Sequence, residues 1–81
     1  MTSHAIDSPS TLGRTVRTLR KSIGITQPQL ALTSGTGLRF IVDLEKGKPT
    51  CQVGKVLQVL KTLGAAVLLE TTVRAPNGSK T

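Results

Sequence analysis

Few side chains in this sequence have the types and spacing needed for catalysis or metal binding. The chain contains one histidine, His4, and one cysteine, Cys51, which together cannot form a structural zinc site. Its acidic residues are scattered at Asp7, Asp43, Glu45 and Glu70. Neither a Ser/His/Asp set nor a glycine-rich phosphate loop after a strand is present. We therefore expect no enzyme activity, no metal site and no cofactor.

The basic side chains are more informative. Lysine and arginine number 11 against four acidic residues, which gives a net charge of +7 on 81 residues. This charge favours polyanionic partners, with nucleic acid ahead of an anionic membrane; the alternative is that it only aids solubility. Phe40 is the sole aromatic residue, which disfavours stacking on single-stranded bases. Double-stranded DNA is therefore the preferred partner.

The pattern of apolar residues disfavours a membrane partner. The longest apolar run, residues 65–69, is far shorter than the roughly 20 residues of a spanning helix. Residues 1–7 lack the basic and apolar regions of a signal peptide. A lone cysteine also fits a reducing compartment. We expect a cytoplasmic protein.

The basic residues are positioned first by a helix that follows Ser8. Ser8 is the expected N-cap, Pro9 occupies the first helical position, and Gly24 ends the helix. An apolar stripe with helical spacing is formed by Leu12, Val16, Leu19 and Ile23. Another face is basic and contains Arg14, Arg17 and Lys21.

Two short helices are predicted next. Thr26 and Gln29 have the spacing of a capping box at the start of the second helix, and Gly35 ends that helix. The third helix is expected over residues 38–46, with Gly37 as its N-cap. Its inner side is formed by Ile41 and Leu44.

A fourth helix is expected from Thr50 or Cys51 to Gly64. Its predicted apolar stripe consists of Val53, Val56, Leu57, Leu60 and Leu63. Its predicted outer side consists of Gln52, Lys55, Gln58 and Lys61. Phe40 is expected at the side of the core, with a protein-binding surface as the alternative, and Cys51 is expected to be buried or to cap a helix.

Residues 66–73 are rich in branched and apolar side chains, which favours a β-strand. A single strand in a helical domain lacks a partner for its backbone groups, so we expect it to pair with the same strand of a second copy. The strand residues assigned to this homodimer are Val67, Leu68, Leu69, Glu70 and Thr71. The expected organisation is one domain, 8–73, between flexible ends at 1–7 and 74–81.

Residues 25–48 contain the most informative pattern, in which two helices of about two turns flank Gly35. The small Ala31 lies where these helices would approach each other most closely. The segment resembles the Cro/Xre repressor family in the spacing of Thr26-Gln27, Leu30-Ala31, Gly35, Ile41 and Leu44-Glu45-Lys46-Gly47-Lys48.

The chain is similar in particular to the HipB-type antitoxins. This resemblance rests on residues 8–12 at the start of the first helix, 59–64 at the end of the fourth, and the strand at 66–72. It covers about residues 8–72. It implies a mainly α, four-helix, lambda-repressor-like helix-turn-helix domain whose C-terminal β-strand pairs across a two-fold dimer.

The resemblance implies roles for residues of the third helix, whose groove-facing side contains Leu38, Arg39, Val42 and Asp43. Arg39 is the preferred base contact, because its guanidinium matches the O6 and N7 acceptors of guanine; a phosphate contact is the alternative. Asp43 either accepts from cytosine N4 or orients Arg39, and we favour orientation. Leu38 either contacts a thymine methyl group or packs.

Phosphate contacts are expected from Gln27 and Gly37 at two helix starts, and from the Thr36 hydroxyl. Arg14, Arg17 and Lys21 either contact phosphates or form a solvated face. The resemblance also implies that Arg20 and Glu45 form an ion pair joining the first helix to the end of the third.

The implied function is a repressor that binds a palindromic DNA operator and regulates its own operon as the antitoxin of a HipA-like kinase toxin. The two half-sites would lie about one turn, ~34 Å, apart. The alternatives are a stand-alone Xre-type regulator without a toxin, and a protein-interaction module whose main role is to neutralise a toxin.

Overall fold

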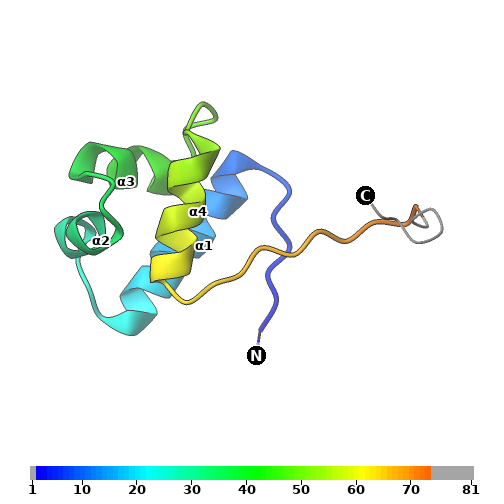
Figure 1. The fold of residues 1–81 in the computed structure, drawn as a ribbon, viewed down its shortest axis with the longest axis horizontal. Helices are drawn as coiled ribbons and strands as arrows, with labels where there is room; N and C mark the ends of the chain where they lie inside the picture. The colour runs from blue at the N-terminus through cyan, green and yellow to red at the C-terminus, as the bar shows by residue number, and fades with distance from the viewer. Residues whose placement is uncertain (1, 74–81) are drawn as a thin grey trace.

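The computed structural model describes residues 2–73, which contain four helices (Figure 1). Helix α1 spans Pro9–Ile23. The Ser8 hydroxyl accepts a hydrogen bond from the Thr11 amide at 3.1 Å, and Gly24 ends the helix in a left-handed conformation. The predicted caps of the first helix are therefore confirmed.

Helices α2, Gln27–Ser34, and α3, Leu38–Glu45, form the helix-turn-helix. Both bonds of the capping box are present: the Gln29 amide donates to the Thr26 hydroxyl at 3.2 Å, and the Thr26 amide donates to the Gln29 side chain at 2.8 Å. Gly35 adopts φ +71° at the end of α2. Gly37 is the N-cap of α3, as predicted, and α3 ends one residue earlier than expected.

The core lies where α3 packs on α1 and α2, and where α2 packs on α4. Figure 1 shows α4 crossing in front of α1, with α2 and α3 beside them. The buried apolar residues come from all four helices and the turn after α4: Val16, Leu30, Ala31, Ile41, Leu44, Val56, Val59, Leu60 and Leu63. Phe40 and Cys51 pack at the edge of this core. None of the helices in the described part is long and apolar enough to cross a membrane.

Helix α4, Val53–Thr62, departs from its prediction in start and in buried face. It begins two or three residues later than expected. Val59, absent from the predicted stripe, is fully buried, whereas Val53 and Leu57 are 71% and 47% exposed. Ile23 on α1 is likewise exposed, contrary to prediction. Periodicity identifies an apolar helix, but the position of α2 decides which edge of the apolar stripe on α4 becomes buried.

Gln58 was also assigned wholly to the outer side of the fourth helix. The structure places its Nε2 atom 2.9 Å from the Ser34 carbonyl oxygen, to which it donates a hydrogen bond. This bond satisfies a carbonyl in the last turn of α2, where the helix has no partner of its own. Gln58 therefore ties α4 to the helix-turn-helix despite its exposure.

After α4, the chain extends away from the helices (Figure 1). Through residue 73 it forms no strand, and Val67, Leu68 and Leu69 are exposed. The expected strand pairs only with its counterpart in a second copy, so one chain provides no partner for its backbone groups. Strand pairing across a dimer stays a prediction, as do the domain boundaries. The tail at 74–81 lies outside the described residues.

Gly13, in the middle of α1, permits the close approach of α3. A Cβ atom at this position would lie 2.7 Å from the Glu45 carbonyl oxygen and would also collide with the Leu44 carbonyl oxygen. Both atoms belong to the backbone and cannot move aside as a flexible side chain would. The end of α3 therefore rests directly on the backbone of α1, which makes Gly13 a determinant of the angle between the two helices.

We expect Gly13→Ala to lower the free energy of unfolding by about 1–3 kcal/mol, because the steric cost of overpacking exceeds the gain in helix propensity. The matched control is Gly54→Ala in α4, where an added Cβ would meet no atom within 4 Å. In that variant the free energy of unfolding should rise by up to about 1 kcal/mol, because alanine has a higher helix propensity than glycine. Urea denaturation measures both changes, and equal stabilisation by the two alanines would contradict the proposed contact.

Candidate DNA-binding surface

The inner and outer sides of α3 differ in the way that a groove-binding helix requires. Ile41 and Leu44 are buried against the other helices. Four residues lie on the remaining surface and are exposed or half-buried: Leu38, Arg39, Val42 and Asp43. The structure therefore gathers the four predicted base-facing residues on one side of the helix. Contact with bases remains a prediction.

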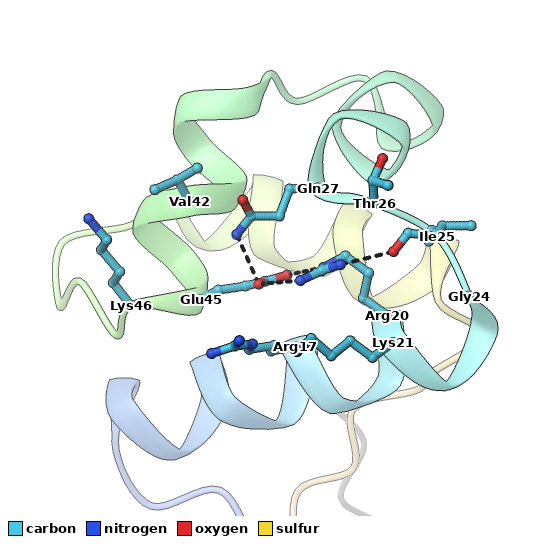
Figure 2. Close-up of a pocket in the computed structure, with 10 residues that line it drawn as sticks. All are labelled: Arg17, Arg20, Lys21, Gly24, Ile25, Thr26, Gln27, Val42, Glu45 and Lys46. Atoms are coloured by element: carbon cyan, nitrogen blue, oxygen red, sulfur yellow. Dashed lines mark hydrogen bonds and ion pairs between the residues drawn. The ribbon is translucent and has the colours of Figure 1, made fainter.

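The angle of α3 is held by an ion pair between Arg20 on α1 and Glu45 at the end of α3 (Figure 2). Arg20 donates from Nε and Nη2 to the two carboxylate oxygens at 2.7 and 3.0 Å. A third donor, Nη1, bonds to the Ile25 carbonyl oxygen at 2.9 Å. The side chains are only 10% and 4% exposed. The predicted pairing is present, with the bidentate geometry that arginine and carboxylate favour.

The electrostatic surroundings keep Arg20 charged. Its pKa is raised, chiefly because the guanidinium donates hydrogen bonds to Glu45, and additionally by the negative charge of that carboxylate. Burial opposes this effect but does not outweigh it. Two opposite charges thus face each other with little exposure to solvent, where an unpaired partner would be unfavourable.

Gln27, at the first position of α2, joins the same network. Its Nε2 atom donates to Glu45 Oε1 at 3.1 Å, so one carboxylate connects α1, α2 and α3. Gln27 was expected only to contact phosphate at the start of α2, and this contact with Glu45 was not predicted. No local spacing indicates it, because the two residues are 18 positions apart.

Asp43 on the outer side of α3 lies between two cations. Its carboxylate oxygens are 3.5 Å from Arg39 Nε, one turn earlier, and 3.5 Å from Lys48 Nζ in the loop after α3. The pairing with Arg39 agrees with the orienting role expected from their spacing. The pairing of Asp43 with Lys48 was not predicted, because it depends on the path of the loop that follows α3.

An open groove of about 630 Å³ lies between α1 and the helix-turn-helix (Figure 2). Its basic lining comes from Arg17 and Lys21 on α1, with Lys46 beyond the end of α3. Gln27 and Val42 line the groove above the Arg20–Glu45 pair (Figure 2). The groove is thus positively charged and sits next to the outer side of α3.

The other predicted phosphate contacts are not part of this groove. Arg14 is exposed on α1 and donates to Ser10 at 3.4 Å. Thr36 and Gly37 lie in the turn before α3, where the Thr36 hydroxyl is 2.9 Å from that of Ser34. Of the predicted phosphate-contacting residues, Arg17, Lys21 and Gln27 therefore line the groove, whereas Arg14, Thr36 and Gly37 lie outside it.

Glu45→Gln should lower the free energy of unfolding by about 3–5 kcal/mol, because it leaves the Arg20 guanidinium buried without its charge partner. Replacing both residues with leucine should cost less than the sum of the two single leucine variants. As a control, Arg39→Gln disrupts an exposed pair and should change stability by less than about 1 kcal/mol. Chemical denaturation provides all these values; additive effects at Arg20 and Glu45 would exclude their coupling.

Comparison with known proteins agrees with this architecture. No family model matches the chain. A helix-turn-helix-type transcriptional regulator of Sinorhizobium fredii, y4mF, is 56% identical over 62 residues, covering 76% of this chain and 82% of that protein.

Solved structures of HipB share the fold. HipB in complex with the O4 20-mer matches with a TM-score of 0.78 at 22% identity, covering 88% of this chain and all of that one. A serine-to-alanine variant of HipB in complex with the O2 20-mer matches with a TM-score of 0.79 at 22% identity, covering 89% of this chain and all of that one. A chain of the HipA–HipB–O2–O3 complex matches with a TM-score of 0.78 at 24% identity, covering 88% of this chain and all of that one. The relative from Sinorhizobium fredii shows that the chain belongs to the helix-turn-helix transcriptional regulators, and the HipB structures show that it shares their fold.

Proposed function

We propose that this protein is a sequence-specific transcriptional repressor that places α3 in the major groove of a palindromic operator. The observation that carries the proposal is the exposed outer side of α3, held at one angle by the buried Arg20–Glu45 pair. A helix that is rigidly fixed on its inner side can present the same side chains to every base pair that it meets. The closer relative, a transcriptional regulator, supports this function.

Base recognition is assigned mainly to Arg39, whose side chain is 89% exposed. Its planar guanidinium can donate two hydrogen bonds to O6 and N7 of guanine. Leu38 and Val42 present apolar groups beside it, which suit a thymine methyl group. This arrangement makes Arg39 the residue on which the choice of sequence depends most.

Phosphate contacts are assigned to the positive surface around α3. Arg17 and Lys21 contribute from the groove, and Arg14 from the exposed face of α1. The first turns of α2 and α3, at Gln27 and Gly37, direct amide groups and positive dipole ends outward. The Thr36 hydroxyl, next to Gly37, adds a further donor. Such contacts orient the protein on DNA without selecting a sequence.

A homodimer completes the proposal. Val67, Leu68 and Leu69 are exposed on an extended segment, and a second copy of that segment would cover them while pairing their backbone groups. Glu70 and Thr71 would continue the same strand. Two-fold symmetry then places the two α3 helices at half-sites about one turn, ~34 Å, apart. A small domain of this size also gains stability from association.

Selection from a pool of random-sequence DNA duplexes tests the function directly. We expect the purified protein to enrich a palindrome with half-sites about one helical turn apart. Binding to the enriched duplex should weaken steeply with salt, as expected when roughly 6–10 phosphates are contacted. Enrichment of no sequence, or binding that is independent of salt, would rule out this function.

Two variants separate base contacts from phosphate contacts on the enriched duplex. Arg39→Ala should lower its affinity by roughly 5- to 150-fold and relax the preference at one guanine, because a bidentate contact is lost. Lys21→Ala should weaken binding to the enriched duplex and to random duplexes equally. It should also reduce the slope of log affinity against log salt concentration by about 0.9. Titrations by fluorescence anisotropy at several salt concentrations measure both. A uniform loss in Arg39→Ala would instead assign Arg39 to a phosphate.

A second candidate function, antitoxin of a HipA-like kinase, deepens the first. The favouring observation is the likeness of nearly the whole fold to HipB, which occurs in a HipA–HipB–O2–O3 complex. The two functions are compatible, because a repressor that binds the toxin can regulate the operon that encodes both. The competing possibilities are a stand-alone regulator and a module that serves chiefly to neutralise the toxin.

Co-expression with the neighbouring reading frame tests the antitoxin function. We expect that frame to encode a HipA-like kinase that co-purifies with this protein and whose growth inhibition is relieved by it. A kinase with an inactivated ATP site should still co-purify, which separates binding from activity. If no kinase is encoded there, or if the two chains do not associate, the protein is a stand-alone regulator.

A further inference from the structure

Asp43 is unusual among the acidic residues of this protein. Glu45 is engaged in the buried pair, Asp7 precedes α1, and Glu70 lies on the segment after α4. Asp43 alone among these four stands on the outer side of α3. A negative charge at that place would approach the phosphates of any bound duplex, which opposes binding.

Two cations from different elements compensate this charge. Arg39 on α3 and Lys48 in the following loop each approach the Asp43 carboxylate to 3.5 Å. The Asp43 side chain is 22% exposed, whereas those of Arg39 and Lys48 are 89% and 52% exposed. The three groups together carry a net charge of +1 where two free cations would carry +2. The local attraction to phosphates is correspondingly weaker.

The geometry at Arg39 leaves its base-binding atoms available. Asp43 approaches Nε, and the Arg39 side chain is 89% exposed, so its terminal amino groups are accessible to a ligand. These two groups can form the paired hydrogen bonds to guanine O6 and N7 while Asp43 keeps its contact. A guanine edge is a neutral acceptor and tolerates the nearby carboxylate, but a phosphate is repelled by it.

We propose that Asp43 is a specificity-determining residue, which directs Arg39 toward guanine and weakens phosphate contacts by Arg39 and Lys48. Its carboxylate lowers affinity for every duplex but lowers it most where phosphates are the only ligands. The ratio of operator to random binding therefore rises. This inference rests on the proposed function, because it assumes that α3 enters the major groove.

The experiment compares Asp43→Asn with Asp7→Asn, which changes the net charge equally but at a residue that precedes α1 and does not lie on α3. The probes are a 20-bp random-sequence duplex pool and the duplex enriched by the unaltered protein. At about 0.1 M salt, Asp43→Asn should bind the random pool roughly five-fold more tightly. Its salt slope should steepen by about 0.9 for each cation that moves to a phosphate. The operator-to-random ratio should fall, while Asp7→Asn leaves that ratio unchanged.

Several outcomes would overturn the inference. An unchanged operator-to-random ratio in Asp43→Asn would show that the carboxylate does not affect discrimination. Equally weaker binding to both probes would assign Asp43 a structural role. A loss of base preference confined to one cytosine of the operator would make Asp43 a direct base contact. Failure of the unaltered protein to enrich any sequence would instead reject the proposed function itself.

Folding is controlled in the same experiment. Asp43→Glu retains the charge and should keep most of the operator-to-random ratio, whereas Asp43→Asn should not. Both variants should unfold within a few degrees of the unaltered protein, because the two cations that pair with Asp43 are mostly exposed and such ion pairs contribute little to stability. Loss of the ratio in Asp43→Glu to the same extent as in Asp43→Asn, with stability intact, would contradict a role for the negative charge.

Discussion

The arrangement of α1, α2 and α3 depends on one buried carboxylate. Glu45 accepts two hydrogen bonds from Arg20 and a third from Gln27, and Arg20 also donates to the carbonyl of Ile25. Removing a charge from water costs several kcal/mol unless its partners are well placed. No side-chain polar atom that is fully buried in the described residues lacks a partner. The network therefore tolerates few alternative helix angles.

A fixed angle matters because α3 has little stability of its own. It has eight residues, and isolated helices of that length are marginal in water. Its persistence comes from Ile41 and Leu44 in the core and from the close contact of its last turn with Gly13. These contacts use the inner side and the end of the helix. The outer side is left available for Arg39 and Asp43 without any cost to the fold.

Features that depend on neighbouring residues could be predicted from the sequence. The caps at Ser8 and Thr26 act over three positions, so their residue types and spacing were sufficient evidence. The outer side of α3 could be predicted from its buried side, which contains Ile41 and Leu44. Contacts between distant residues were not predictable in the same way. Gln27 with Glu45, Lys48 with Asp43 and the buried position of Val59 all depend on how separate elements meet.

The amino-acid sequence alone determined the four helices, the turn at Gly35 and an excess of positive charge, because capping, periodicity and composition are local properties. The Arg20–Glu45 pair was known only through a family resemblance. Tertiary structure decided which edge of α4 is buried, why Gly13 must lack a side chain and which cations compensate Asp43. These features arise from distances between residues remote in the chain, which become defined only when the helices pack.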